Sequence, residues 1–177
     1  MKRIFNRIII GLLCFWGFLS GNAEENSSLP VKKWLNIAFV SHSTGELELD
    51  IFRPNDSKER AVVLCLHGGF WAKGSKNFMH PLAEDLVEKG YIAVCSNYRL
   101  TDVAPAPAQL HDVFSAIRFL RKNASEYEID PKKIGVTGSS AGGYLAVMAA
   151  VFDSGDKRTR PNAAVGMGAQ TDLLSPH

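Results

Sequence analysis

The sequence is poor in the residues that hold metal ions or phosphate groups. Its 177 residues include only three cysteines and five histidines, and none of them stand at the short spacings that zinc sites use. The glycine-rich segment 138–143 lacks the lysine of a P-loop. The sequence also contains no internal repeat and no low-complexity tract. These absences predict a single globular domain with no metal and no other cofactor.

An excess of charge of one sign is also lacking. The chain has 20 Lys and Arg against 18 Asp and Glu, and 46% of its residues are hydrophobic. Because the two signs are mixed along the sequence, we expect no nucleic-acid partner. Cys65 and Cys95 fall inside apolar, strand-like runs. We expect free buried thiols there, with a disulfide as the alternative if the two strands are neighbours.

No apolar run is long enough to span a bilayer, which takes about 20 residues. The longest, residues 8–19, follows three basic residues and precedes small ones, a pattern typical of a secretory signal peptide. We predict a signal peptide over 1–23, a linker over 24–33 and a domain over 34–177, in a secreted or periplasmic protein without a stable membrane anchor. Removing the signal peptide takes away three of the 20 basic residues and none of the 18 acidic ones, which leaves a formal net charge of −1.

Strand-like and helix-like patterns alternate along the rest of the chain. Strands are predicted at 35–40, 46–52, 61–66, 91–95, 133–137 and 163–168, and helices at 79–87, from 108 onward and at 141–152. The first two strands form a hairpin, and the second alternates Glu46, Glu48 and Asp50 with apolar residues, which predicts one solvated face. The later alternation predicts an α/β fold with a mostly parallel sheet and flanking helices.

A G-x-S-x-G pattern, Gly138-Ser139-Ser140-Ala141-Gly142, joins the strand at 133–137 to the helix at 141–152. Such a tight strand-to-helix turn holds a serine in a strained conformation with its hydroxyl exposed. We therefore predict Ser140 as a nucleophile, with glycines flanking it because side chains would crowd the turn. The N–H of Ala141, at a helix N-terminus, is a candidate oxyanion donor.

A second glycine motif, His67-Gly68-Gly69-Phe70-Trp71, follows the buried strand at 61–66. The backbone N–H groups of Gly69 and Phe70 are candidate oxyanion donors that would converge with that of Ala141. We expect the imidazole of His67 to brace this loop by hydrogen bonding rather than to act as the base.

Two charged residues farther along the chain, Arg99 and Asp112, have a predicted structural role. We expect their side chains to form an ion pair that holds a strand end against the following helix. Among the other histidines, His42, His80 and His111 are expected on the surface or in packing contacts.

Six segments together resemble the α/β-hydrolases of the hormone-sensitive-lipase-like and bacterial feruloyl and acetyl-xylan esterase-like (BD-FAE-type) family. They are Leu-Asp-Ile-Phe-Arg-Pro at 49–54, His-Gly-Gly-Phe-Trp at 67–71, Tyr-Arg-Leu at 98–100, Gln-Leu-His-Asp at 109–112, Asp-Pro at 130–131 and Gly-Ser-Ser-Ala-Gly-Gly at 138–143. The resemblance implies a serine carboxylic-ester hydrolase that acts through an acyl-enzyme on Ser140, with Trp71 near the substrate. It also implies a small-molecule or polysaccharide ester as substrate, with acetyl or feruloyl esters of carbohydrates favoured.

In this fold the acid and then the histidine follow the serine along the chain. Only 37 residues follow Ser140, and Asp172 comes too early to match the acid of the family. The sequence is therefore expected to be the N-terminal part of a longer enzyme, inactive by itself, in which the strand at 163–168 is left as an exposed apolar edge. The alternatives are a peptidase or arylformamidase of the same fold, or an inactive binding protein.

Overall fold

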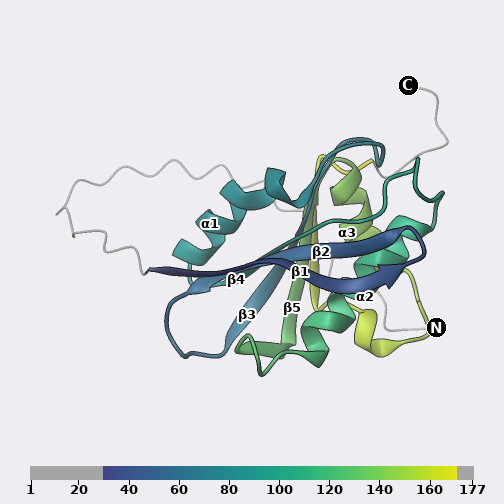
Figure 1. Ribbon diagram of the computed structural model, residues 1–177. Coiled ribbons are helices and arrows are strands. Elements are labelled where there is room, and N and C mark those ends of the chain that lie inside the picture. The colour runs from purple at the N-terminus through teal and green to yellow at the C-terminus, as the bar shows by residue number, and fades with distance from the viewer. Residues whose placement is uncertain (1–29, 171–177) are drawn as a thin grey trace.

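The computed structural model of the protein describes residues 30–170 and places them around a single six-stranded sheet (Figure 1). The strands are β1 (Val31–His42), β2 (Gly45–Pro54), β3 (Arg60–Leu66), β4 (Ile92–Ser96), β5 (Ile129–Ser139) and β6 (Ala163–Met167). The α-helices are α1 (His80–Glu88), α2 (Ala108–Lys122) and α3 (Ala141–Val151), and two short 3-10 helices are η1 (Lys76–Met79) and η2 (Lys157–Thr159). The predicted signal peptide lies outside the described residues, and β1 begins at Val31, inside the predicted linker.

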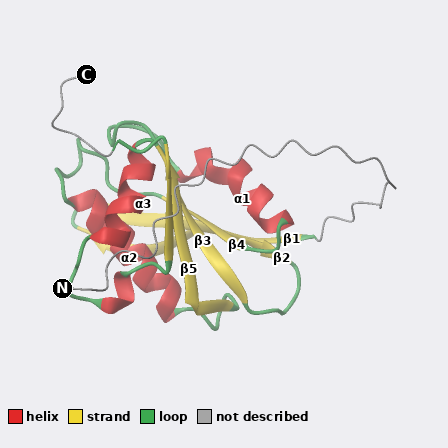
Figure 2. Ribbon diagram, turned by 180° about the vertical axis from the view of Figure 1, so that it is seen from behind, coloured by secondary structure: helices red, strands yellow, loops and turns green. Residues whose placement is uncertain are grey.

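The strand order is β1-β2-β4-β3-β5-β6. The pairs β3–β4, β3–β5 and β5–β6 are parallel, whereas β2 is antiparallel to both β1 and β4. Helix α1 lies on one face of the sheet, and α2 and α3 lie on the other (Figure 2). The predicted hairpin and the mostly parallel sheet with flanking helices are therefore confirmed. The carboxyl ends of β3, β4 and β5 meet at one edge of the sheet, where α/β proteins place their sites.

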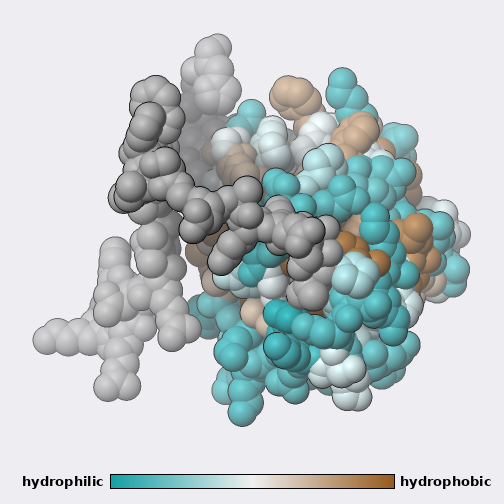
Figure 3. All heavy atoms as spheres, turned by 90° about the vertical axis from the view of Figure 1, so that its left-hand side faces the viewer, coloured by the Kyte–Doolittle hydropathy of each residue, from teal (hydrophilic) through white to brown (hydrophobic). Residues whose placement is uncertain are grey.

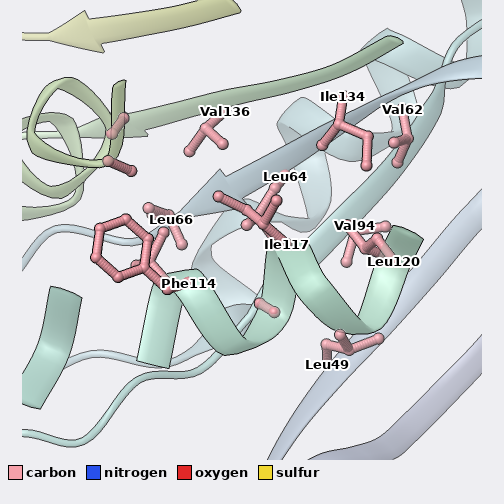
Figure 4. Close-up of a cluster of buried hydrophobic side chains, with 14 of the residues drawn as sticks. Leu49, Val62, Leu64, Leu66, Val94, Phe114, Ile117, Leu120, Ile134 and Val136 are labelled. Atoms are coloured by element: carbon pink, nitrogen blue, oxygen red, sulfur yellow. The ribbon is translucent and has the colours of Figure 1, made fainter. Parts of the chain in front are cut away.

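The larger hydrophobic core lies between the sheet and helix α2 (Figure 4). Phe114, Ile117 and Leu120 recur at helical spacing and pack on the side chains of β3, β4 and β5. Under α1 lies a smaller core, which contains Cys65 and Cys95 opposite each other in the β3–β4 register. Both thiols are free, as expected, and the neighbouring thiol together with burial raises the pKa of Cys95.

The predicted solvated face of β2 is present only at its start, where Glu46 is exposed and Glu48 is half-buried, whereas Asp50 is buried. Asp50 is 1% exposed and Arg53 is 0% exposed, because β2 is an interior strand between β1 and β4 and because α1 packs against it. The Arg53 guanidinium donates hydrogen bonds to the carbonyl oxygens of Pro54, Tyr127 and Lys58. It also contacts the Glu128 carboxylate. This arginine therefore ties the end of β2 to the turn that precedes β5.

Ten large hydrophobic side chains of the described residues are exposed. The face that Figure 3 shows is mostly hydrophilic, with separate hydrophobic residues. At the sheet edge, Val165 and Met167 of β6 are 54% and 41% exposed, which confirms the exposed apolar edge expected from the sequence. No helix in residues 30–170 is long and apolar enough to cross a membrane.

The connection between β5 and α3 is a single residue, Ser140, with φ 51° and ψ −115°. A Cβ atom on Gly138 would overlap the backbone of Gly142, and one on Gly142 would overlap the carbonyl group of Leu66. Glycine is therefore needed at both positions for the close approach of backbones rather than for flexibility. The strained strand-to-helix turn predicted from the sequence is present.

Arg53 offers a test of what its buried guanidinium contributes to stability. Arg53→Met is expected to lower the free energy of unfolding in urea by about 3–5 kcal/mol, because it leaves Glu128 and several carbonyl oxygens without their donor. Arg118 is a matched control, since it is 45% exposed where it pairs with Asp156. Arg118→Met should cost less than about 1 kcal/mol. Equal losses in the two variants would contradict the assignment.

The turn at Ser140 can be tested with two glycines of the same strand. Gly138→Ala is expected to lower the free energy of unfolding by about 1–3 kcal/mol, because the backbones of β5 and α3 must move apart. At Gly135 a Cβ would lie 3.8 Å from the nearest atom, the Val62 carbonyl oxygen. Gly135→Ala should leave the stability unchanged or raise it by up to about 1 kcal/mol. Urea titrations measure the free energy of unfolding of both variants. An unchanged value for Gly138→Ala would show that the turn tolerates a side chain.

Candidate active site

Ser140 stands at the carboxyl end of β5 and at the start of α3. Its N–H donates a hydrogen bond to the Met167 carbonyl oxygen at 2.8 Å, and its own carbonyl oxygen accepts one from Tyr144 at 2.9 Å. The first bond ties the turn to β6, and the second begins the hydrogen bonding of α3. Among residues 30–170, no side chain forms a hydrogen bond with the Ser140 hydroxyl. The hydroxyl is therefore held by its strained backbone alone.

The β3–η1 loop, residues 67–75, lies against this turn. A Cβ atom on Gly68 would be 3.4 Å from the Cβ of Ser140. Three consecutive loop residues have positive φ: Gly69 at 118°, Phe70 at 55° and Trp71 at 60°. Within the described part of the chain, the N–H groups of Gly69 and Phe70 donate to no acceptor, whereas the Gly69 carbonyl oxygen accepts bonds from the next turn of the loop. Two backbone donors are thus available beside Ser140.

Ala141 is the first residue of α3. The first N–H groups of a helix have no partner within the helix and lie at the positive end of its dipole. Ala141 is 1% exposed. The three residues predicted to donate to an oxyanion therefore belong to two segments that the fold brings together.

His67 lies at the base of the loop and is 1% exposed. Its Nδ1 donates a hydrogen bond to the Gly68 carbonyl oxygen at 2.8 Å, and its ring stacks on Tyr98 with the centroids 4.2 Å apart. The Tyr98 hydroxyl donates to the His67 carbonyl oxygen at 2.8 Å. Burial lowers the pKa of His67 against the opposing effect of the Gly68 carbonyl. A neutral ring that donates to its own loop confirms the predicted bracing role.

The predicted ion pair between Arg99 and Asp112 is also present. The guanidinium Nη2 is 2.7 Å from Asp112 Oδ1, and the backbone N–H of Arg99 donates to Oδ2 at 2.9 Å. His42 Nε2 lies 3.0 Å from Oδ1, a contact that the sequence analysis missed because His42 is 70 residues away in the β1–β2 hairpin. Asp112 is 1% exposed, so these contacts satisfy a buried carboxylate and hold the segment after β4 to α2.

A second buried carboxylate, Asp50, was also missed. The Lys76 ammonium group and His80 Nε2 are both within 2.9 Å of its oxygens. Lys76 directly follows the β3–η1 loop. Thus His42, His67 and His80 each contact a partner other than Ser140, while His111 is exposed on α2. Asp172 and His177 lie outside the described residues.

Trp71, the predicted substrate contact, packs edge-on against Tyr144 with the ring centroids 5.5 Å apart. Phe70 is 67% exposed, so an aromatic side chain stands in solvent on the same loop. A cavity of about 280 Å³ lies on this edge of the sheet, lined by Gly74 and Ser75 of the loop, by the β1–β2 turn and by the segment after β4. No cluster of three or more His, Cys, Asp or Glu side chains placed to hold a metal occurs in residues 30–170.

Comparison with known proteins places this arrangement among ester hydrolases. The chain is 38% identical over 117 residues to the probable carboxylic ester hydrolase LipM of Mycobacterium tuberculosis, covering 64% of this chain and 27% of that protein. It is 41% identical over 90 residues to the carboxylesterase NlhH of the same species, covering 50% of this chain and 28% of that protein. Arylacetamide deacetylase of Oryctolagus cuniculus is 38% identical over 162 residues, covering 81% and 40%. The chain thus spans about a quarter of the length of the mycobacterial relatives.

The fold comparison agrees with the sequence comparison. The butyrate-bound esterase Est2 of Thermogutta terrifontis superposes with a TM-score of 0.66 at 27% identity, covering 78% of this chain and 52% of that one. A profile of the BD-FAE family matches residues 49–169, which include the β3–η1 loop, Arg99, Asp112 and Ser140. The predicted family is confirmed, and the chain belongs to the BD-FAE family of the α/β-hydrolase fold.

Proposed function

We propose that the protein is a serine carboxylic-ester hydrolase with Ser140 as the nucleophile. The observation that supports this most directly is the strained Ser140, whose hydroxyl has no hydrogen-bond partner among residues 30–170, next to a loop in which the Gly69 and Phe70 N–H groups have no acceptor among the same residues. Strain of this kind costs about 1–3 kcal/mol and persists where function requires it. The names of the relatives, among them a carboxylesterase and a probable carboxylic ester hydrolase, support the same chemistry.

In the proposed reaction the Ser140 oxygen attacks the carbonyl carbon of the ester. A bond forms between these two atoms, and the carbonyl oxygen becomes an oxyanion that the N–H groups of Gly69, Phe70 and Ala141 stabilise. Expulsion of the alcohol leaves an acyl-enzyme, which water then cleaves. Because His42, His67 and His80 contact other groups and His111 is exposed on α2, the proposal assigns the base that accepts the Ser140 proton to none of these four histidines.

The finer proposal is an exported enzyme that acts on acetyl or feruloyl esters of carbohydrates. The predicted signal peptide supports export, and the exposed aromatic ring of Phe70 together with Trp71 supports an apolar contact with the substrate. An amide substrate is the second candidate, since one relative is an arylacetamide deacetylase. p-Nitrophenyl acetate and p-nitroacetanilide compare the two, and faster cleavage of the anilide would favour the amide.

Ser140 can be tested against the serine beside it. In a full-length enzyme that also supplies the base, Ser140→Ala should lower p-nitrophenyl acetate turnover at least about a thousandfold, because no other side chain replaces the nucleophile. Paraoxon should add one diethylphosphoryl group to Ser140, detected by peptide mass spectrometry, with release of p-nitrophenol. Ser139→Ala is the control, since Ser139 is exposed on β5 and outside the turn. Labelling that survives Ser140→Ala would refute the assignment.

A further inference from the structure

Asp50 and Lys76 form an ion pair that is almost completely buried. The Lys76 ammonium Nζ is 2.8 Å from Oδ1 and 2.9 Å from Oδ2 of the Asp50 carboxylate. The Lys76 side chain is 7% exposed and that of Asp50 is 1% exposed. Asp50 is on β2, whereas Lys76 is the first residue of η1. The pair therefore connects the interior of the sheet to the end of the β3–η1 loop.

The remaining polar atoms of the pair are also satisfied. Lys76 Nζ donates to Asn36 Oδ1 at 2.7 Å, and the Asn36 N–H donates to Asp50 Oδ1 at 2.8 Å. His80 Nε2 is 2.8 Å from Asp50 Oδ2. Burial would raise the pKa of Asp50, but the hydrogen bonds from Lys76, Asn36 and His80 together hold it below its ordinary value. The carboxylate is therefore charged, and the pair is a complete network rather than a partly satisfied one.

Lys76 is fixed through its backbone as well as its side chain. Its N–H donates to the Asn97 side-chain oxygen at 2.8 Å, just beyond β4. Two residues earlier, Gly74 lies close to both His67 and Gly68. A Cβ atom on Gly74 would be 2.7 Å from the Gly68 carbonyl oxygen. The loop is thus closed on itself near Gly74 and anchored immediately afterwards at Lys76.

The loop needs such an anchor because its backbone is strained. Phe70 and Trp71 both have left-handed φ values, and each non-glycine residue of this kind costs about 1–3 kcal/mol unless its surroundings impose it. Phe70 is 67% exposed, so packing of its own side chain does not hold it. Trp71 is held by the Thr101 N–H, which donates to its carbonyl oxygen at 2.9 Å, and by its contact with Tyr144. The contacts of His67 and Lys76 fix the two ends of the loop.

We propose that Asp50 and Lys76 are a positioning pair, which holds the β3–η1 loop in the conformation that presents the N–H groups of Gly69 and Phe70 beside Ser140. The catalytic role of the pair rests on the proposed ester hydrolysis. The effect of the pair on the loop conformation can be measured without any turnover. An apolar pair of similar volume would stabilise the fold about as well. It would not fix the end of the loop through directed hydrogen bonds.

Hydrogen exchange of the intact chain followed by mass spectrometry tests the proposal. Lys76→Met leaves a buried carboxylate unpaired, so the double variant Asp50→Asn/Lys76→Met, which buries no charge, is measured beside it. In the double variant the loop amides that are hydrogen-bonded, those of Ala72 and Lys73, should exchange at least about tenfold faster, as expected when a charge-assisted hydrogen bond is lost. Peptides from α2 and β5 should exchange at the rate of the unmodified protein. Lys33→Met is the matched control, because Lys33 joins the same hairpin to α1 through an exposed pair with Glu84.

Trp71 supplies a second, spectroscopic readout. The chain has three tryptophans, Trp16, Trp34 and Trp71, so Trp16→Phe/Trp34→Phe leaves Trp71 as the only one. Adding the double variant to this background should make Trp71 fluorescence more accessible to acrylamide, because the ring loses its fixed contact with Tyr144. Adding Lys33→Met should leave the quenching unchanged.

The outcomes separate the positioning role from simple stabilisation. Faster exchange confined to residues 67–75 supports the proposal. Unchanged loop amides, or an equal acceleration in every peptide, would overturn it. The paraoxon reaction at Ser140 is recorded in parallel and should slow in the double variant. Absence of labelling in a full-length enzyme that also supplies the base would count against the proposed function, while the exchange data would still decide the role of the pair.

Discussion

The backbone of Gly142 lies against the carbonyl groups of Leu66 and His67, and the rest of the site depends on this contact. It brings the first turn of α3 to the carboxyl end of β3, so that Ser140 and the β3–η1 loop become neighbours although 70 residues separate them. No side chain could occupy the space between the two backbones. The strain at Ser140 is the consequence, since the chain must pass from β5 into a helix that already touches β3.

Buried charges account for the way in which the other segments are held. Asp50 joins β2 to the residue after the β3–η1 loop, Asp112 joins the segment after β4 to α2 and to the hairpin, and Arg53 joins β2 to the turn before β5. Each of these groups is at most 1% exposed and each is fully hydrogen-bonded. The β1–β2 hairpin contributes a residue to each of the three networks: Asp50, Arg53 and, beside Asp112, His42. The hairpin therefore extends the sheet and also holds in place the segments at the edge where Ser140 lies.

Much of this arrangement could be predicted from the sequence, and what could not has a common physical reason. Ser140, the donor loop and α2 were predictable because glycine spacing and helical periodicity are local signals. Asp50 was placed on a solvated face because local alternation cannot reveal that a lysine 26 residues away will cover it. The contact of His42 with Asp112 was missed for the same reason, because it depends on how the hairpin packs against α2. The ion pair of Arg99 with Asp112 was predicted only because the two residues are 13 positions apart, on a strand end and the helix that follows it.

The buried charged groups that hold the segments of the site are paired. Lys76 is neutralised by Asp50 and Arg99 by Asp112, while burial keeps His67 uncharged. The groups proposed to stabilise the oxyanion beside Ser140 are backbone dipoles: the loop N–H groups and the N-terminus of α3. Dipoles attract a permanent anion only weakly in contact with water, but they stabilise a negative charge that develops where water is excluded. In the proposed reaction such a site would discriminate between a neutral ester and its oxyanion, and that difference would accelerate the acyl transfer.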